Sequence, residues 1–185
     1  TEQTVTVTGV DDSVQDGNIA YTIITGAAAS LDSNYSGRVV SDISVTNTDD
    51  ADTAGITVTP ISGLTTSEGG LTAAFTIALN SQPTEDVTIA LSSTKKSEGT
   101  VSPSSLTFTS ANWSTEQTIT VTGVNDSVQD GPIAYTIETA AAVSGDSNYS
   151  GLPASDVSVT NNDNDTAGIN VSAISGNTSE PSGTA

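Results

Sequence analysis

The chain contains the acidic, turn-rich stretch Gly123-Val124-Asn125-Asp126-Ser127-Val128-Gln129-Asp130-Gly131, which lies between two runs of alternating apolar residues. A near copy of this stretch occupies residues 9–17, and the two copies are 114 residues apart. Two copies of so specific a loop indicate a tandem array of structural units. Carboxylates and amides lie close together within the loop, and a glycine stands at each end. This pattern is typical of a loop that folds around a cation.

The repeat extends well beyond the loop. Residues 1–50 match residues 115–164 at 37 of 50 positions without a gap, and residues 53–56 match residues 166–169 after a deletion of one residue, which gives a repeat of about 113 residues. This is the usual size of one β-sandwich domain. We therefore predict that residues 1–52 are the C-terminal part of one repeat, residues 53–165 a complete repeat, and residues 166–185 the opening of a third. Because the first residues read like the middle of a strand, we expect the chain to be a window of a longer protein.

Apolar residues in the complete repeat alternate with Thr, Ser and Ala, and this period of two predicts strands. Seven strands are predicted, at residues 55–60, 71–79, 86–91, 105–109, 116–122, 133–139 and 156–160. Their predicted inward side chains are Ile56, Val58, Phe75, Ile77, Leu79, Val87, Ile89, Leu91, Leu106, Phe108, Ile119, Val121, Ile133, Tyr135, Ile137, Val157 and Val159. Only Ala140-Ala141-Ala142 is compatible with a helical turn. The predicted fold is all-β, a tandem array of Ig-like antiparallel β-sandwiches.

The amino-acid composition excludes several classes of partner and catalytic mechanism. The net charge is -19, from 3 Lys and Arg against 22 Asp and Glu, which argues against nucleic acid or an anionic membrane surface as partner. The chain has no Cys and no His, so thiol catalysis, disulfides, the usual zinc sites and Ser-His-Asp triads are excluded. No apolar run reaches the roughly 20 residues needed to span a membrane. We predict a non-enzymatic protein that is secreted or displayed on a cell surface.

Strand direction predicts which acidic residues meet, because alternate loops of an antiparallel sandwich lie at the same end. Glu68, Asp126, Asp130, Asp163 and Asp165 are expected to converge where one repeat hands over to the next. Asp146 and residues 49–52 belong to the opposite end. Converging carboxylates repel each other, and Ca²⁺, which takes six to eight oxygen ligands in a tolerant geometry, suits them better than Mg²⁺. An ordinary hairpin turn at residues 125–130 remains the alternative.

Several short motifs of the complete repeat together resemble the Calx-beta family. They are Ser67-Glu68-Gly69, residues 99–108, Ile119-Thr120-Val121, Asn125-Asp126 with Asp130, and Val157-Ser158-Val159-Thr160 with the Asp run that follows. The resemblance implies a calcium-binding sandwich in which the ligands are Glu68, Asn125, Asp126, Asp130, Asp163 and Asp165. The repeat extends this prediction to Asp11, Asp12, Asp16, Asp49, Asp50 and Asp52 of the preceding unit.

The predicted function is that of a structural extender or filament-forming segment of a large extracellular protein, with Ca²⁺ at the repeat junctions. Its predicted partners are neighbouring repeats of the same chain, and identical chains in a fibre remain open. The alternative is an adhesin module that binds a carbohydrate or protein ligand through residues 140–153. Within that loop, the segment from Asp146 to Gly151 is predicted to be a turn anchored by Tyr149. Trp113 is predicted to cap the core.

Overall fold

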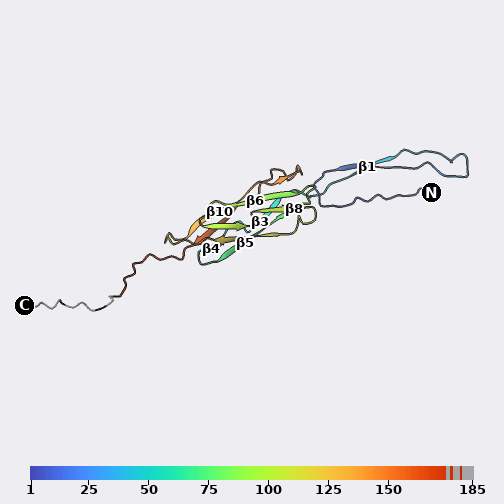
Figure 1. Ribbon diagram of the computed structural model, residues 1–185. Helices are drawn as coiled ribbons and strands as arrows, with labels where there is room; N and C mark the ends of the chain where they lie inside the picture. The colour runs from blue at the N-terminus through green and yellow to red at the C-terminus, as the bar shows by residue number, and fades with distance from the viewer. Residues whose placement is uncertain (174–175, 177–179, 181–185) are drawn as a thin grey trace, which may run out of the picture.

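The computed structural model describes residues 1–173, 176 and 180, and these residues form an elongated molecule (Figure 1). A β-sandwich lies in the middle. A long hairpin extends from one end of the sandwich toward the N-terminus, and the chain leaves at the other end toward the C-terminus. The described residues contain strands, turns and loops, and none of them forms a helix long and apolar enough to cross a membrane. The predicted all-β fold is confirmed.

Two sheets form the sandwich, which lies within residues 53–165, the predicted complete repeat. One has the order β11-β6-β10-β12-β4 with β8 also paired to β6, and the other has the order β3-β5-β9-β7. The strands of the first sheet are β4 (Leu64–Ser67), β6 (Val87–Ser93), β8 (Ser105–Phe108), β10 (Ile133–Thr139), β11 (Val143–Ser144) and β12 (Val157–Asn162). Those of the second are β3 (Ile56–Thr59), β5 (Thr72–Leu79), β7 (Gly99–Ser102) and β9 (Gln117–Gly123). All pairs are antiparallel except β12 with β4.

The core lies between the inner faces of the two sheets. Every side chain predicted to point inward is buried, apart from Ile56 and Ile133, which are half-buried. Ala142 and Tyr149 complete the core from the loop beyond β10, and Trp113 packs against its edge as predicted. Burial of each large apolar side chain stabilises the fold by roughly 1.5–3 kcal/mol. Because the side chains predicted to point inward are the ones that are buried, the alternation of apolar residues predicted the strand register correctly.

The first predicted strand, residues 55–60, corresponds to β3, and the strand that follows it, β4, was not predicted. β3 pairs with β5, and after residues 60–63 the chain continues as β4 beside β12. Pro60 follows β3 directly and has no N–H to continue the ladder. Gly63 then takes a φ of +79°, which favours glycine. Two more short strands, β7 and β11, were not predicted, and the helical turn considered at residues 140–142 does not form.

Residues 1–52, predicted to be the C-terminal part of a preceding repeat and called the half-repeat below, form a two-stranded hairpin of β1 (Ile19–Ile23) and β2 (Ile43–Asn47). Its register, with Ile19 opposite Asn47, repeats that of β10 and β12, where Ile133 lies opposite Asn161. Residues 1–8 read like a strand but are exposed and unpaired among the described residues. Their counterpart β9 pairs with β5 and β7, whereas no described strand lies beside residues 1–8. Strand pairing, rather than local sequence, decides this difference.

Residues 166–173, at the start of the predicted third repeat, contain no strand. The rest of that prediction, from residue 174 onward, lies almost wholly outside the described residues.

Candidate metal centre

The acidic loop leaves β9 through Gly123, which packs tightly against neighbouring strands. A Cβ at this position would lie 2.5 Å from Asn161 Oδ1 and 2.6 Å from the backbone oxygen of Ser67. Asn161 is 2% exposed, and its Nδ2 donates a hydrogen bond to Val124 O at 3.1 Å. The start of the loop is therefore held against β12 and β4, and only glycine fits there without displacing the backbone.

The segment after β12 closes the loop from the other side. The backbone N–H of Gly131 donates to Asp163 Oδ2 at 2.8 Å, and the N–H of Asp165 donates to Asp163 Oδ1 at 2.7 Å. Asp163 thus uses both carboxylate oxygens to join the far end of the loop to the linker. These two hydrogen bonds, led by the one from Asp165, lower the pKa of Asp163. Asp163 is therefore ionised over most of the pH range.

Glu68 reaches the same place because β4 runs parallel to β12. Strand β4 ends at Ser67 opposite Asn162, so Glu68 emerges beside the linker. Its N–H donates to Asn162 O at 3.1 Å, and its Oε2 accepts a hydrogen bond from the N–H of Asn164 at 3.2 Å. The side chain is only 8% exposed. Glu68 does lie at the predicted end, and β4, which sequence reasoning missed, is the element that brings it there.

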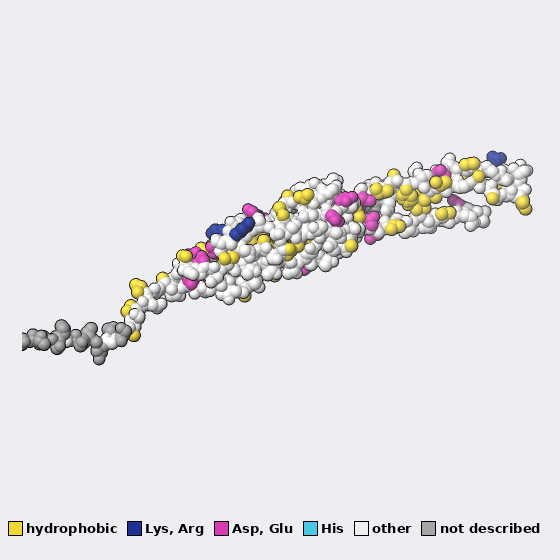
Figure 2. Space-filling view, viewed as in Figure 1, with side chains coloured by type: hydrophobic (Ala, Val, Ile, Leu, Met, Phe, Trp, Pro, Cys, Tyr) yellow, Lys and Arg dark blue, Asp and Glu magenta, His cyan; other side chains and the backbone are white. Residues whose placement is uncertain are grey.

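Six carboxylates meet at this end of the repeat. In each of three triads the ligand oxygens lie within 4.8 Å of one another. The triads are Glu68–Asp130–Asp163, Glu68–Asp126–Asp165 and Glu98–Asp126–Asp130. Figure 2 shows the acidic side chains gathered here, where the sandwich gives way to the C-terminal segment. The five carboxylates expected to converge do so.

Glu98 belongs to this cluster but was not among the predicted ligands. It lies in the loop between β6 and β7, its residue is 9% exposed, and Val124 N donates to its backbone oxygen at 2.9 Å. The strand-direction argument applies to this loop as well, so its glutamate could have been added to the ligand set. Lys95 and Lys96 of the same loop are exposed.

The pKa of Glu68 is shifted in the opposite direction from that of Asp163. The largest single influence on Glu68 is the hydrogen bond from Asn164, which lowers its pKa. Burial and the negative charges of Asp126, Asp163 and Asp165 together outweigh that bond, so the pKa of Glu68 is raised above its usual 4.5. The raised pKa of Glu68 reflects the mutual repulsion of these carboxylates, which a bound cation would reduce.

Asn125 and Asp126 form hydrogen bonds within the loop and with the linker. Asp126 Oδ1 accepts from the N–H of Val128 at 2.7 Å, the hydrogen bond of an ordinary Asx turn. The Oδ1 of Asn125 accepts from Asn164 Nδ2 at 3.4 Å, so the predicted amide ligand lies beside the linker. The turn interpretation therefore describes the backbone of the loop. It does not account for the meeting of acids from four separate segments.

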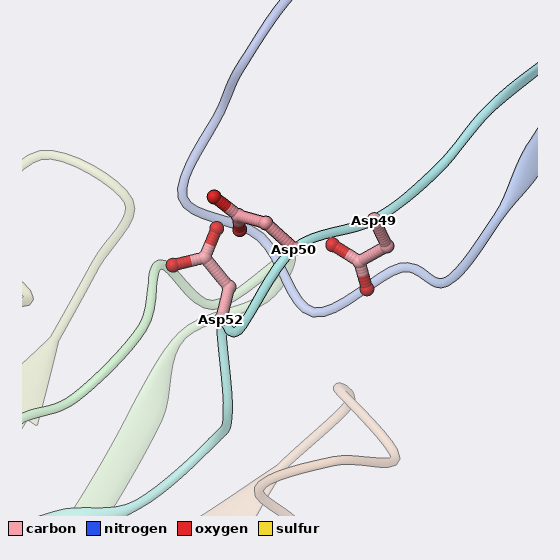
Figure 3. Close-up of side chains that lie close together, drawn as sticks. All are labelled: Asp49, Asp50 and Asp52. Atoms are coloured by element: carbon pink, nitrogen blue, oxygen red, sulfur yellow. The ribbon is translucent and has the colours of Figure 1, made fainter.

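The preceding junction gathers the remaining predicted residues. Asp11, Asp12, Asp16, Asp49, Asp50 and Asp52 all line one small cavity of about 50 Å³. Figure 3 shows the carboxylates of Asp50 and Asp52 turned toward each other, with Asp49 beside them. Burial first, then the charge of Asp50 and of the other acids, raises the pKa of Asp52. The acidic residues of this cavity come from the loop and the linker, and Ile19 of β1 and Asn47 of β2 are also part of its lining.

The two acidic loops share the same local hydrogen bonds. Gly17 N donates to Asp49 Oδ2 at 2.9 Å, as Gly131 N does to Asp163. Val14 N donates to Asp12 Oδ1 at 2.8 Å, as Val128 N does to Asp126. Residues 1–52 keep this geometry although β1 and β2 are their only described strands. The loop and its linker are therefore encoded locally.

Asp146 lies at the other end, as predicted, and serves a structural purpose. Its two oxygens accept from Thr84 N and Asn148 N, each at 2.8 Å. Burial is the largest influence and raises its pKa, but these hydrogen bonds prevail and the pKa is lowered. Tyr149, 1% exposed, anchors the turn through hydrogen bonds between its hydroxyl and Ser81. The predicted anchored turn is confirmed.

No protein-family model matches this chain, and no curated protein sequence matches it significantly. Among solved structures, the periplasmic chaperone SfaE has a TM-score of 0.45 and 12% identity over 60% of this chain, which spans 58% of the chaperone. The MSP-domain protein SSP-19 of Caenorhabditis elegans has a TM-score of 0.39 and 14% identity over 60% of this chain and 99% of its own. Domains 4–9 of the surface layer protein SbsC have a TM-score of 0.37 and 25% identity over 75% of this chain and 18% of that one. Similarities of this size carry no inference about function.

Proposed function

We propose that this chain is part of a tandem array of Calx-beta-like sandwiches that acts as a structural extender of a large secreted or cell-surface protein. Ca²⁺ bound at each repeat junction would fix the angle between neighbours, and the role would be mechanical rather than catalytic. The elongated arrangement of hairpin, sandwich and linker along one direction supports the role of an extender (Figure 1).

The observation that carries the calcium proposal is the set of three overlapping carboxylate triads at the exit of the complete repeat. Calcium–oxygen distances are about 2.3–2.6 Å, so two oxygens bound to one ion lie at most about 5 Å apart. The oxygens of each triad meet that limit. Because the triads share Glu68, Asp126 and Asp130, the cluster suits more than one ion.

A second argument for a bound cation, independent of the number of acids, comes from one atom of the cluster. Asp165 Oδ2 is buried and has no hydrogen-bond partner among the described residues. A buried carboxylate oxygen without a partner is costly, because it has lost water and gained nothing in exchange. A cation held with Glu68 and Asp126 would supply the missing partner. Carboxylates from flexible loops favour Ca²⁺ over Mg²⁺, which needs a stricter octahedron and keeps its waters.

The adhesin alternative gains no comparable support. It relied on residues 140–153 as a free recognition loop. In this chain Ala142 and Tyr149 of that loop are buried in the core, and Asn148 Nδ2 donates to Gln15 O of the preceding unit at 2.8 Å. Part of this loop is thus occupied by contacts with the core and with Gln15.

The test is to compare a three-repeat chain in calcium and in chelator by thermal unfolding and small-angle scattering. Calcium should raise the unfolding temperature, because a ligand that binds only the folded state stabilises it by mass action. Chelation should broaden the distribution of distances within the molecule. Identical unfolding temperatures and identical scattering in the two conditions would rule out the proposal.

A further inference from the structure

A second set of contacts joins the half-repeat to the complete repeat, and none of them uses a carboxylate. Ser13 O accepts from Gln82 N at 2.7 Å, and Gln15 O accepts from Asn148 Nδ2 at 2.8 Å. The side-chain Oε1 of Gln15 accepts from Ala54 N at 2.6 Å. The acceptors lie within three consecutive residues of the acidic loop. The donors come from three separate segments of the following unit.

The surface of the following unit that receives these contacts is held in place by internal hydrogen bonds. Asn148 sits in the turn that Asp146 holds through Thr84 N and Asn148 N, and Tyr149 ties the same turn to Ser81. Asp146 is 5% exposed and Tyr149 is 1% exposed. The amide of Asn148 is therefore presented on a fixed base. Ordering it against the loop of the preceding unit costs little further entropy.

Each repeat carries both halves of this contact, at opposite ends. The segment Ser127-Val128-Gln129 repeats Ser13-Val14-Gln15, and Gln129 Oε1 accepts from Ala167 N at 2.5 Å, as Gln15 does from Ala54. The turn Asp32-Ser33-Asn34-Tyr35 repeats Asp146-Ser147-Asn148-Tyr149. In this exposed copy Asn34 Nδ2 donates locally to Asp32 Oδ1 at 3.0 Å. The docked copy instead donates across the junction.

We propose that these contacts form a cation-independent clamp between successive repeats. The Ser-Val-Gln segment of one repeat is the docking surface, and its partner is a following repeat that carries the Asp-Ser-Asn-Tyr turn. The clamp holds the two units in contact and selects which unit can follow, while an ion at the acidic cluster would restrict the remaining movement. This inference concerns different residues from the calcium proposal, so either can fail without the other.

Amide hydrogen exchange of the 185-residue chain, measured by NMR in chelator, tests the clamp. In the unmodified chain the amides of Ala54 and Gln82 should be protected. Gln15→Ala removes the acceptor of Ala54 N and should speed its exchange about tenfold. Asn148→Ala leaves the Ser13 carbonyl in place, and should speed exchange at Gln82 only if the contacts act together as a clamp.

Gln129→Ala is the matched control. It removes the same side chain from the other copy of the loop and should speed exchange at Ala167 while leaving Ala54 and Gln82 unchanged. Exchange of Ala54 and Gln82 at the rates of an unfolded chain, or no response of Ala54 to Gln15→Ala, would overturn the clamp. A chain protected only when calcium is present would also overturn it, since the contact would then depend on the ion.

Discussion

The backbone N–H of Asn164 donates a hydrogen bond to Glu68 Oε2 at 3.2 Å, although 96 positions separate the two residues. The carboxylate that follows the first strands of the repeat is thereby fixed to the linker that leaves it. A change in the charge of Glu68 acts directly on the joint between repeats. Because Glu68 is bonded to the linker, we expect the ionisation of the cluster to affect both the stability of the sandwich and the position of the linker.

Glu68→Gln tests the electrostatic state of the cluster. A carboxyl group whose folded-state pKa is raised stabilises the fold when protonated, below its usual 4.5, and this contribution is lost as the pH rises through the raised value. In chelator at pH 7, Glu68→Gln should therefore raise the unfolding temperature, and the gain should disappear as the pH falls below 4.5. In calcium the same change should lower the unfolding temperature, because a ligand is lost.

The control for this prediction is Glu116→Gln, which neutralises an exposed glutamate just before β9. It should not respond differently to calcium and chelator. Thermal unfolding followed by circular dichroism across a pH series measures both variants. A lower unfolding temperature for Glu68→Gln in chelator at pH 7 would contradict the account.

Tyr149→Phe tests the anchor of the turn that faces the preceding repeat. The Tyr149 hydroxyl donates to Ser81 O at 2.6 Å and accepts from Ser81 N at 3.1 Å. Its loss leaves buried backbone groups unpaired and should lower the free energy of unfolding by about 1–3 kcal/mol. Tyr35→Phe is the control, because the matching tyrosine of the half-repeat is 64% exposed. Urea denaturation should separate the two variants, and equal stabilities would be inconsistent with the anchor.

Gly123→Ala tests the close approach that positions the acidic loop. The added Cβ would lie 2.6 Å from the backbone oxygen of Ser67, so β4 and the loop must move apart. We expect a loss of about 1–3 kcal/mol in the free energy of unfolding, typical of overpacking. Gly168→Ala adds the same methyl group where no atom lies within 4 Å, and should have little effect. Urea denaturation of both variants is the measurement, and an unchanged stability for Gly123→Ala would refute the steric argument.

Much of the fold follows from the pattern of apolar residues. The paired alternation of Ile119 with Val121 and of Val87 with Ile89 places all four inward, and the structure buries them. Short strands were missed because β4 and β7 each contain a single large apolar residue, Leu64 and Val101, which shows no period. Residues 1–8 show the opposite case. Their apolar and polar residues alternate, but they form no strand because no other strand pairs with them.

The acidic cluster was predictable from strand direction, because that argument needs only the order of strands and the position of acids. The contribution of Gln15 and Gln129 was not predicted, since glutamine suggests no metal chemistry. The only sequence signal for this contribution was that both copies of the loop have glutamine at the same position. Hydrogen bonds between repeats depend on how the units meet, which no local pattern records.

Calorimetric titration of the chain with Ca²⁺ tests the central claim most directly. The account predicts saturable binding of more than one ion per chain, with Mg²⁺ a weak competitor. Asp130→Ala should weaken binding by roughly tenfold or more. Asp86→Ala, which removes an exposed acid at the other end of the sandwich, should leave it unchanged. No binding at millimolar calcium, or equal losses from Asp130→Ala and Asp86→Ala, would contradict the account.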